Sequence, residues 1–426
     1  MQNYIQLSQG CSFGHEDISP HGHINHAQVI IANSLAREQG LSRRTTAPAH
    51  FAITNARLFS STGLSPARTI IVYNRRITAI CSTDEPSCTL TSIPQDAIYD
   101  GEGMTLLPGL IDSHAHPSNT THLQALTAAG VTSTVLANCP LPALCSSLDN
   151  HPGLTSIIRG SLAATSPNST HAALLLAQGG NATLPRFISN LTQIPGWVAS
   201  ELSDGGADFI KIIGSAPAAG LGAAAQALIV REAHAPGRRR RLVILHASST
   251  IAFAQGLEAG ADQIHHSTLD APLDNALIAG FAVPGTAVVC PTLTMMRVIV
   301  DQVGPPGATF AAAFETARRL HVAGVSLLVG TDGNLEPMSP AQVPFGTSLH
   351  DELENMVALV GMTPAEALRA ATEVPAHAFG LRDRGVVAVG KRADIVLVDG
   401  DPTVDIRAVR NVRRVWVDGV EFGGIP

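Results

Sequence analysis

The sequence predicts an α/β protein: a (β/α)8 barrel of the TIM type with a small β-sandwich built from both chain ends. Between residues 105 and 380, apolar β-prone runs alternate with helical segments, and this stretch is close to the roughly 250 residues that such a barrel needs. On either side of it, at residues 50–104 and 381–426, the pattern changes to short strands separated by turn residues. That change predicts a separate β domain made from both ends.

Two regions lie outside the predicted barrel. Residues 1–49 are polar and aperiodic. His21, His23 and His26 suggest a metal site there, but no strand or helix pattern holds them rigid, so we expect a flexible extension or a lid. The strands of the small domain are expected at Phe51–Leu58, Thr69–Tyr73, Arg76–Ile80, Gly385–Val389, Ala393–Val398 and Arg413–Val420.

Within the predicted barrel, seven apolar runs have the length and the β-branched content of strands. They are Leu106–Ser113, Thr132–Ala137, Phe209–Ile213, Leu242–Leu245, Asp262–His265, Thr286–Val289 and Ser326–Val329. The helices expected around them are Leu123–Ala129, Ala223–Ala233, Ile251–Ala259, Ala311–Ala323 and Leu349–Val360. Another helix begins after Thr363, which forms a capping box with Glu366 and precedes a proline at the first helical position.

Composition and charge exclude several classes of protein. The net charge is −7, which disfavours a nucleic-acid-binding surface. The chain has no run of about 18 apolar residues, so we expect no membrane span. Its N-terminus has no basic start followed by an apolar core, and we therefore expect a cytoplasmic location.

The six cysteines are too few for a disulfide scaffold, and they form no paired C-x-x-C zinc motifs. Cys81 with Cys88, and Cys139 with Cys145, are close enough in sequence to bridge. Free thiols are nevertheless our expectation for all six.

His114 and His116 end the apolar run that begins at Leu106. Side chains alternate along a strand, so residues two apart point the same way. Two imidazoles that leave a buried strand on one side form half of a metal site, because histidine is the commonest metal ligand. A barrel places its active site at the carboxyl ends of its strands, so the other strand ends decide whether the site is complete.

Four further strands carry ligand-type groups, namely His246, the pair His265-His266, Asp332 and, inside an apolar run, Lys211. A lysine buried in a strand costs several kcal/mol unless it is compensated. Burial lowers its pKa and leaves a nucleophilic amine, which carbon dioxide can convert to a carbamate able to bridge two cations. A chance distribution would rarely supply such a set from five strands.

These motifs resemble those of the metal-dependent amidohydrolase superfamily over nearly the whole stretch from Phe51 to Phe422. The matching segments are Pro-Gly-Leu-Ile-Asp-Ser-His-Ala-His at 108–116, Gly-Ala-Asp-Phe-Ile-Lys at 206–211, the strand ends at His246 and His266, Gly-Thr-Asp at 330–332, and Gly-Lys-Arg-Ala-Asp-Ile-Val at 390–396. The chain is most similar to the imidazolonepropionase- and prolidase-like members, which use a bridging lysine.

The resemblance implies a centre of two divalent cations, taken to be zinc, bridged by N6-carboxylated Lys211. The remaining ligands would be His114, His116 and Asp332 for the more buried cation, and His246 and His266 for the second. In the family pattern the ligand is the second residue of the pair at the sixth strand, so His266 is chosen and His265 is expected to be structural.

The implied function is hydrolysis of an amide C–N bond in a small molecule such as an N-acyl amino acid, a dipeptide-like compound or a cyclic amide. Metal-activated hydroxide would attack the carbonyl, with Asp332 as general base and then general acid. One alternative is a lactone or ester hydrolase, or a non-hydrolytic lyase such as a decarboxylase, on the same metals. Another is a catalytically inactive barrel-shaped binding protein. Barrels of this type often self-associate, so a homo-oligomer is open by analogy.

Substrate contacts are expected from residues that follow the seventh and eighth strands, namely Cys290, Thr292, Arg297, Asn334 and His350. Arg297 could pair with a substrate carboxylate.

Overall fold

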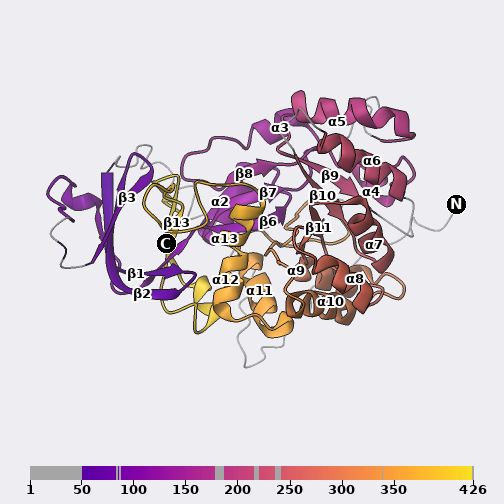
Figure 1. Cartoon of the computed structure of the whole chain (residues 1–426). Coiled ribbons are helices and arrows are strands. Elements are labelled where there is room, and N and C mark those ends of the chain that lie inside the picture. Colours follow the sequence, from indigo (N-terminus) through magenta and orange to yellow (C-terminus); the bar gives the residue numbers. More distant parts are fainter. Residues whose placement is uncertain are drawn as a thin grey trace, which may run out of the picture. The chain divides into compact units, whose positions relative to one another are not determined.

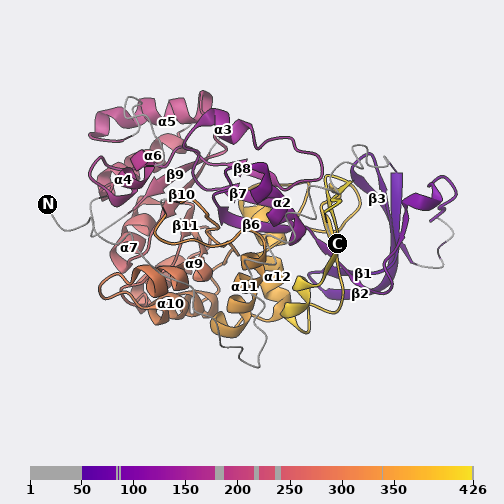
Figure 2. The same ribbon diagram turned by 180° about the vertical axis from the view of Figure 1, so that it is seen from behind.

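The computed structural model describes residues 50–82, 85, 88–177, 187–214, 220–235, 241–337 and 339–424. The expected N-terminal extension, residues 1–49, lies outside the described residues. The described strands form one mixed sheet and two smaller parallel sheets. Helices α5, α6, α7 and α10 lie outside the parallel strands in both views (Figures 1 and 2).

The mixed sheet takes strands from both chain ends, in the order β15-β14-β13-β5-β1-β2-β3, with β4 paired to β1. The first part of the chain supplies β1 (His50–Ser60), β2 (Gly63–Tyr73), β3 (Arg76–Ser82), β4 (Ile98–Asp100) and β5 (Thr105–Pro108). The last part supplies β13 (Ile395–Val398), β14 (Val412–Val417) and β15 (Val420–Glu421). The sheet shared between the two ends agrees with our expectation, whereas packing of two sheets into a sandwich stays a prediction.

Two strand assignments near the C-terminus need correction. Gly385–Val389 forms turns and irregular backbone instead of a strand, because Gly385 has a φ of +89°, which ends an extended run. The expected strand Arg413–Val420 is a hairpin of β14 and β15, since Asp418 and Gly419 both have positive φ and turn the chain between them.

The parallel strands position the candidate site. One sheet holds β6 (Leu110–Ala115), β7 (Val131–Leu136) and β8 (Ser156–Arg159), and the other holds β9 (Phe209–Ile213), β10 (Leu242–His246), β11 (Gln263–His265) and β12 (Val288–Cys290). Isolated bridges at Gly160↔Phe209 and Ala164↔Ile212 connect the segment after β8 to β9. Val289↔Leu327 and Ala115↔Gly333 connect β12 and β6 to the segment that carries Asp332. The α/β alternation is confirmed. The expected strand Ser326–Val329 is reduced to a bridge at Leu327, and closure into a barrel stays a prediction.

The described α-helices are α2 (Thr120–Ala128), α3 (Pro142–Ser146), α4 (Thr170–Ala177), α5 (Ile194–Ser203), α6 (Ala223–Ala233), α7 (Thr250–Ala259), α8 (Asn275–Phe281), α9 (Leu293–Val298), α10 (Phe310–Val322), α11 (Thr347–Asn355), α12 (Pro364–Ala370) and α13 (Glu373–Ala378). The Thr363 capping box is present at α12. No helix in the described part of the chain is long and apolar enough to cross a membrane.

Two disulfides correct the expectation of free thiols. Cys81 bonds to Cys88 and Cys139 bonds to Cys145, with Cα atoms 6.0 and 6.1 Å apart. Short loops bring each pair into the range that a disulfide spans. Among the described cysteines only Cys290 is free, and it is buried. Disulfides persist mainly in oxidising environments, so these two bonds argue against a cytoplasmic location. That location stays a prediction.

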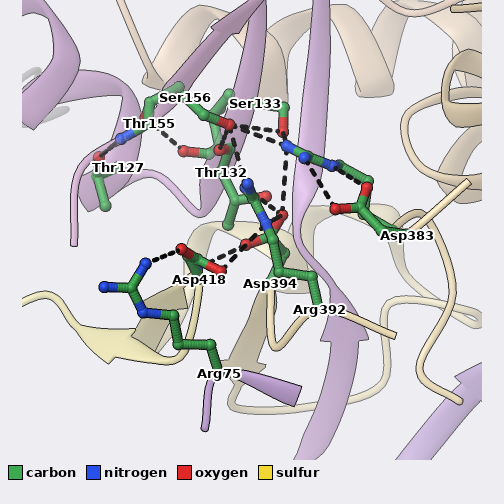
Figure 3. Close-up of polar contacts among 12 residues, drawn as sticks. Arg75, Thr127, Thr132, Ser133, Thr155, Ser156, Asp383, Arg392, Asp394 and Asp418 are labelled. Atoms are coloured by element: carbon green, nitrogen blue, oxygen red, sulfur yellow. Dashed lines mark hydrogen bonds and ion pairs between the residues drawn. The ribbon is translucent and has the colours of Figure 1, made fainter. Parts of the chain in front are cut away.

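An ion-pair network joins the amino ends of the parallel strands to the segment before β13 (Figure 3). We use this name for Arg384, Arg392 and Asp394 together with the hydroxyls of Ser133 and Ser156. Arg384 Nη1 donates to both hydroxyls at 3.0 Å, and Arg392 Nε donates to the carboxylate of Asp394 at 2.7 Å. The Gly-Lys-Arg-Ala-Asp-Ile-Val motif is therefore explained by this buried contact between the mixed sheet and the parallel strands.

Candidate metal centre

His114 and Asp332 come together because their backbones are hydrogen-bonded across neighbouring segments. Asp332 N donates to the carbonyl of His114 at 2.8 Å, and His116 N donates to the carbonyl of Gly333 at 2.8 Å. Nε2 of His114 and of His116 consequently lie 3.5 and 3.0 Å from Oδ1 of Asp332. Ligand atoms of these three side chains all fall within 4.8 Å of one another, close enough for one cation.

His246 and His266 extend this group. Their ring centroids are 4.2 Å apart, and the ring of His266 lies 4.8 Å from that of His114. Nδ1 of His266 is also 3.7 Å from Oδ2 of Asp332. His266 and Asp332 both have positive φ, at 80° and 56°, a conformation that is uncommon for residues other than glycine and often marks a functional site.

Lys211 lies on β9, and only 2% of it is exposed. Its Nζ has no hydrogen-bond partner among the described residues. Burial lowers the pKa of Lys211 to about 8, against the opposing attraction of Asp332 and Cys290. An amine without a partner beside a carboxylate and several imidazoles fits a group that a ligand or a chemical modification completes. We call His114, His116, His246, His266, Asp332 and Lys211 the histidine cluster.

The Gly-Thr-Asp motif is held close to β6 by a second carboxylate. Asp112 accepts hydrogen bonds from Thr331 N at 3.0 Å and from Thr331 Oγ1 at 2.8 Å. Gly330 permits this approach, because a Cβ at that position would lie 2.9 Å from His114 N and 2.6 Å from Cys290 Sγ. Burial raises the pKa of Asp112 to about 7. Asp112 therefore positions the segment that carries Asp332.

Burial also sets the protonation of the imidazoles. It holds the pKa of His114, His246 and His266 well below the ordinary value, and neighbouring charges, including Lys211, act in the same direction. These rings are neutral near pH 7, which is the form that binds metals. The side chains of His116 and Asp332 remain 26% and 14% exposed, so solvent reaches this side of the cluster.

Comparison with known proteins identifies the family. Residues 198–421, just over half of the 426-residue chain, match the model of the Amidohydrolase family. The chain belongs to the amidohydrolase family. This membership confirms the resemblance inferred from the strand-end motifs.

Individual relatives agree with this assignment. A segment is 40% identical over 120 residues to imidazolonepropionase of Deinococcus deserti, covering 27% of this chain and 28% of that protein. The match thus spans little more than a quarter of the length of this curated relative. A putative prolidase from Bifidobacterium longum is similar in structure, with 25% identity, a TM-score of 0.70 and coverage of 88% of this chain and 95% of that one. Molinate hydrolase, at 20% identity, a TM-score of 0.73 and coverage of 89% and 96%, shows likeness of the fold.

The residues predicted to contact substrate fall into two groups. Cys290 and Thr292 lie beside the histidine cluster: the thiol of Cys290 faces Gly330, and the hydroxyl of Thr292 lies 3.0 Å from Nδ1 of His266. Thr292 also has a φ of +46°, which turns the chain from β12 into α9. Glu352 supports this turn by accepting hydrogen bonds from Leu293 N and Thr294 N at 2.8 and 2.7 Å.

The other three side chains have partners away from the cluster. Arg297 is exposed and lies over the ring of Phe310 at 4.0 Å. The side chain of Asn334 bonds within its own loop, to Ser339. His350 is buried with Nε2 2.8 Å from the carbonyl of Ala129. A role for these three in binding substrate stays a prediction.

His171 is a candidate that sequence reasoning missed. It lies in the first turn of α4, and its ring centroid is 4.6 Å from that of His246. Nδ1 of His171 is buried without a hydrogen-bond partner in the described part of the chain, and burial lowers its pKa to about 4. No strand precedes His171 directly, so no local pattern marked it. The run Asn168-Ser169-Thr170 before it is polar and has no apolar periodicity.

Proposed function

We propose that this chain is a binuclear metal-dependent hydrolase that cleaves a C–N bond in a small molecule, such as an N-acyl amino acid, a dipeptide-like compound or a cyclic amide. The observation that carries the proposal is the histidine cluster itself. Five ligand-type side chains and an unpartnered lysine, which are far apart in the sequence, come from β6, β9, β10, the end of β11 and the loop at Asp332. Family membership and relatives named imidazolonepropionase and prolidase support the reaction class.

The donor set fits two zinc ions. The ligands would be His114, His116 and Asp332 for one, and His246 and His266 for the other. Lys211 would bridge them after its neutral amine attacks the carbon of carbon dioxide and loses a proton, which gives an N6-carboxylate with two oxygen donors. The lowered pKa of Lys211 supports this step, since it makes more of the amine neutral near pH 7.

The cations, when bound, would lower the pKa of a water molecule toward about 7 and polarise the scissile carbonyl. Asp332 would take the proton that the attacking water releases, at a carboxylate oxygen, and return it to the leaving nitrogen. The new C–O bond forms first, and the C–N bond breaks once the nitrogen has received the proton, which yields a carboxylate and an amine. His171 and Thr292, which contact His246 and His266, would be further groups beside the site.

The domain organisation is proposed on the same grounds. Residues 105–380 would form a closed (β/α)8 barrel, since isolated bridges already link both edges of the two parallel sheets. Residues 50–104 and 381–426 would form the small β domain around their shared sheet.

Metal analysis tests the proposal. The purified protein should hold two equivalents of zinc, and exhaustive chelation should abolish hydrolysis in a panel of N-acyl amino acids, dipeptides, cyclic amides and lactones. Lys211→Ala should lose at least one equivalent and most of the activity. Lys391→Ala is the matched control, because Lys391 is the chain's other lysine and its Nζ donates to the carbonyl of Arg382. Full activity after chelation, or a Lys211→Ala protein with two zinc ions and normal turnover, would reject the binuclear centre.

A further inference from the structure

His265, expected to be structural, lies directly against a proposed metal ligand. It ends β11 and is fully buried, with 0% exposure. Its Nδ1 lies 2.8 Å from Nδ1 of His114, and its Nε2 lies 2.9 Å from Oε1 of Gln263. Gln263 is on the same strand and 1% exposed. The three side chains form a continuous hydrogen-bonded row that leads from Gln263 to the end of β6.

The positions of the hydrogens in this row follow from its first member. An amide oxygen can only accept, so the contact with Gln263 requires a hydrogen on Nε2 of His265. Both rings are fully buried, and a buried charge without a paired anion is costly, so each ring carries one N–H. His265 therefore presents a lone pair at Nδ1, and the hydrogen between the two rings belongs to Nδ1 of His114.

This assignment leaves Nε2 of His114 with a free lone pair. Nε2 is the atom that lies 3.5 Å from Oδ1 of Asp332. A lone pair facing a carboxylate is unfavourable unless a cation lies between them, so the row prepares His114 to bind one. Ligating histidines commonly have such an outer partner, which fixes the tautomer and the orientation of the ring.

We propose that Gln263 and His265 are positioning residues that hold His114 in the tautomer able to bind a metal through Nε2. The inference rests on the proposed metal centre. If the amide of Gln263 were turned over, its NH2 group would donate to His265, each hydrogen in the row would move to the opposite nitrogen, and His114 would point an N–H at Asp332. An ionised glutamate at position 263 has only acceptor oxygens and permits the metal-binding arrangement alone.

Zinc affinity of the metal-depleted protein, measured by competition with a chelator, provides one test. Gln263→Met removes the acceptor and should weaken binding of the tighter zinc about 10- to 100-fold, the usual effect of losing an outer partner. Gln263→Glu should bind at least as tightly as the unmodified protein. Gln226→Met is the matched control, because Gln226 is equally buried but donates to the carbonyl of Leu221 on α6's N-terminal side.

The neighbouring position gives a second pair of variants. His265→Phe leaves the N–H of His114 without an acceptor and should weaken zinc binding to a similar extent. His265→Asn places a side-chain oxygen near the position of Nδ1 and should recover most of the affinity. Equal affinity in Gln263→Met, Gln263→Glu and the unmodified protein would overturn the inference, as would equal affinity in His265→Phe and His265→Asn.

A readout that needs no metal separates this inference from the proposed function. In ¹⁵N-histidine-labelled, metal-free protein, NMR should find the hydrogen of His114 on Nδ1 and that of His265 on Nε2. A hydrogen on Nε2 of His114 would overturn the inference, even where the protein binds zinc. If the unmodified protein binds no zinc, the proposed function fails, and the NMR spectrum still decides the tautomer. If Gln263→Met does not fold, the spectrum of the unmodified protein still decides the tautomer.

Discussion

Two buried polar groups lie at opposite ends of the same parallel strands, and they differ in how completely their charges are paired. In the ion-pair network at the amino ends, Arg384 and Arg392 meet Asp394 and the hydroxyls of Ser133 and Ser156 (Figure 3). In the histidine cluster at the carboxyl ends, Nζ of Lys211 has no partner among the described residues.

The difference separates a structural group from a functional one. Buried polar groups in native proteins are nearly always hydrogen-bonded, and an exception needs an explanation such as an ion or a catalytic role. The network has its partners within the chain and holds the mixed sheet against the parallel strands. In the cluster, Nζ of Lys211 lacks a partner among the described residues, and burying it has a cost that a bound ligand would offset. Changes in the histidine cluster should therefore reduce activity without reducing stability. Changes in the ion-pair network should reduce stability without reducing activity.

Asp332→Asn should have the largest effect. An amide cannot take the proton of the attacking water, and the rate of hydrolysis should fall by about 10²–10⁴-fold or more, while circular dichroism shows an unchanged fold. Asp301→Asn, at an exposed aspartate, is the control and should keep the full rate. Turnover of Asp332→Asn at the normal rate near pH 7 would contradict the role of Asp332 in proton transfer.

Asp394→Ala should reduce stability instead of catalysis. It leaves Arg392 without the carboxylate that it contacts at 2.5 Å, whereas Arg384 keeps its pair with Asp383. Breaking a buried ion pair in this way costs about 3–5 kcal/mol. Urea unfolding measures the loss, and the rate per folded molecule should not change. Arg407→Ala breaks the exposed pair with Asp405 and should leave the unfolding midpoint where it is. An unfolding midpoint for Asp394→Ala equal to that of the unmodified protein would mean that the network contributes nothing.

His350 gives stability a dependence on pH that neither group explains. Burial lowers the pKa of His350 to about 4, so the folded protein binds fewer protons than the unfolded chain between that pH and about 6.5. Its contribution to stability is complete above pH 6.5 and is lost as the pH falls to about 4, which amounts to about 3 kcal/mol. Urea unfolding from pH 4.5 to 7 should therefore show a smaller decrease for His350→Gln. Parallel curves for the two proteins would show that His350 titrates normally.

The smallest expected effect is a gain in the stability of the metal-free protein on Lys211→Met. It replaces an unpartnered buried amine with an apolar side chain of similar length, and removing such an unsatisfied group should stabilise the fold by about 1–3 kcal/mol. The free energy of unfolding in urea measures the gain, and Lys391→Met should not show it. A loss of stability in metal-free Lys211→Met would mean that the amine has a partner after all.

Local patterns were enough to predict the residues that end strands. His114 and His116 follow an apolar run, and their spacing of two places both on one side of a strand. Asp332 was found for the same reason, as a carboxylate at the end of an apolar segment. The choice of His266 over His265 required the family pattern, because the two are adjacent and both follow β11.

Contacts between distant segments were beyond the reach of such patterns. His171 is in a short helix after an irregular loop, and only the approach of α4 to β10 brings it beside His246. Spacing alone left the pairing of Cys81 with Cys88 and of Cys139 with Cys145 open. Gly385–Val389 has the composition of a strand, but its first residue adopts a positive φ next to the ion-pair network.

The sequence by itself determined the α/β class, the family and the chemical types of the candidate ligand groups, because these depend on periodicity and on residues at the ends of strands. Only the tertiary structure decided which polar atoms find partners. Satisfaction of a buried group depends on atoms far away in the sequence, as in the contact of His265 with His114, which are 151 residues apart. Packing in three dimensions leaves Nζ of Lys211 without a partner among the described residues and pairs the carboxylate of Asp394 with Arg392.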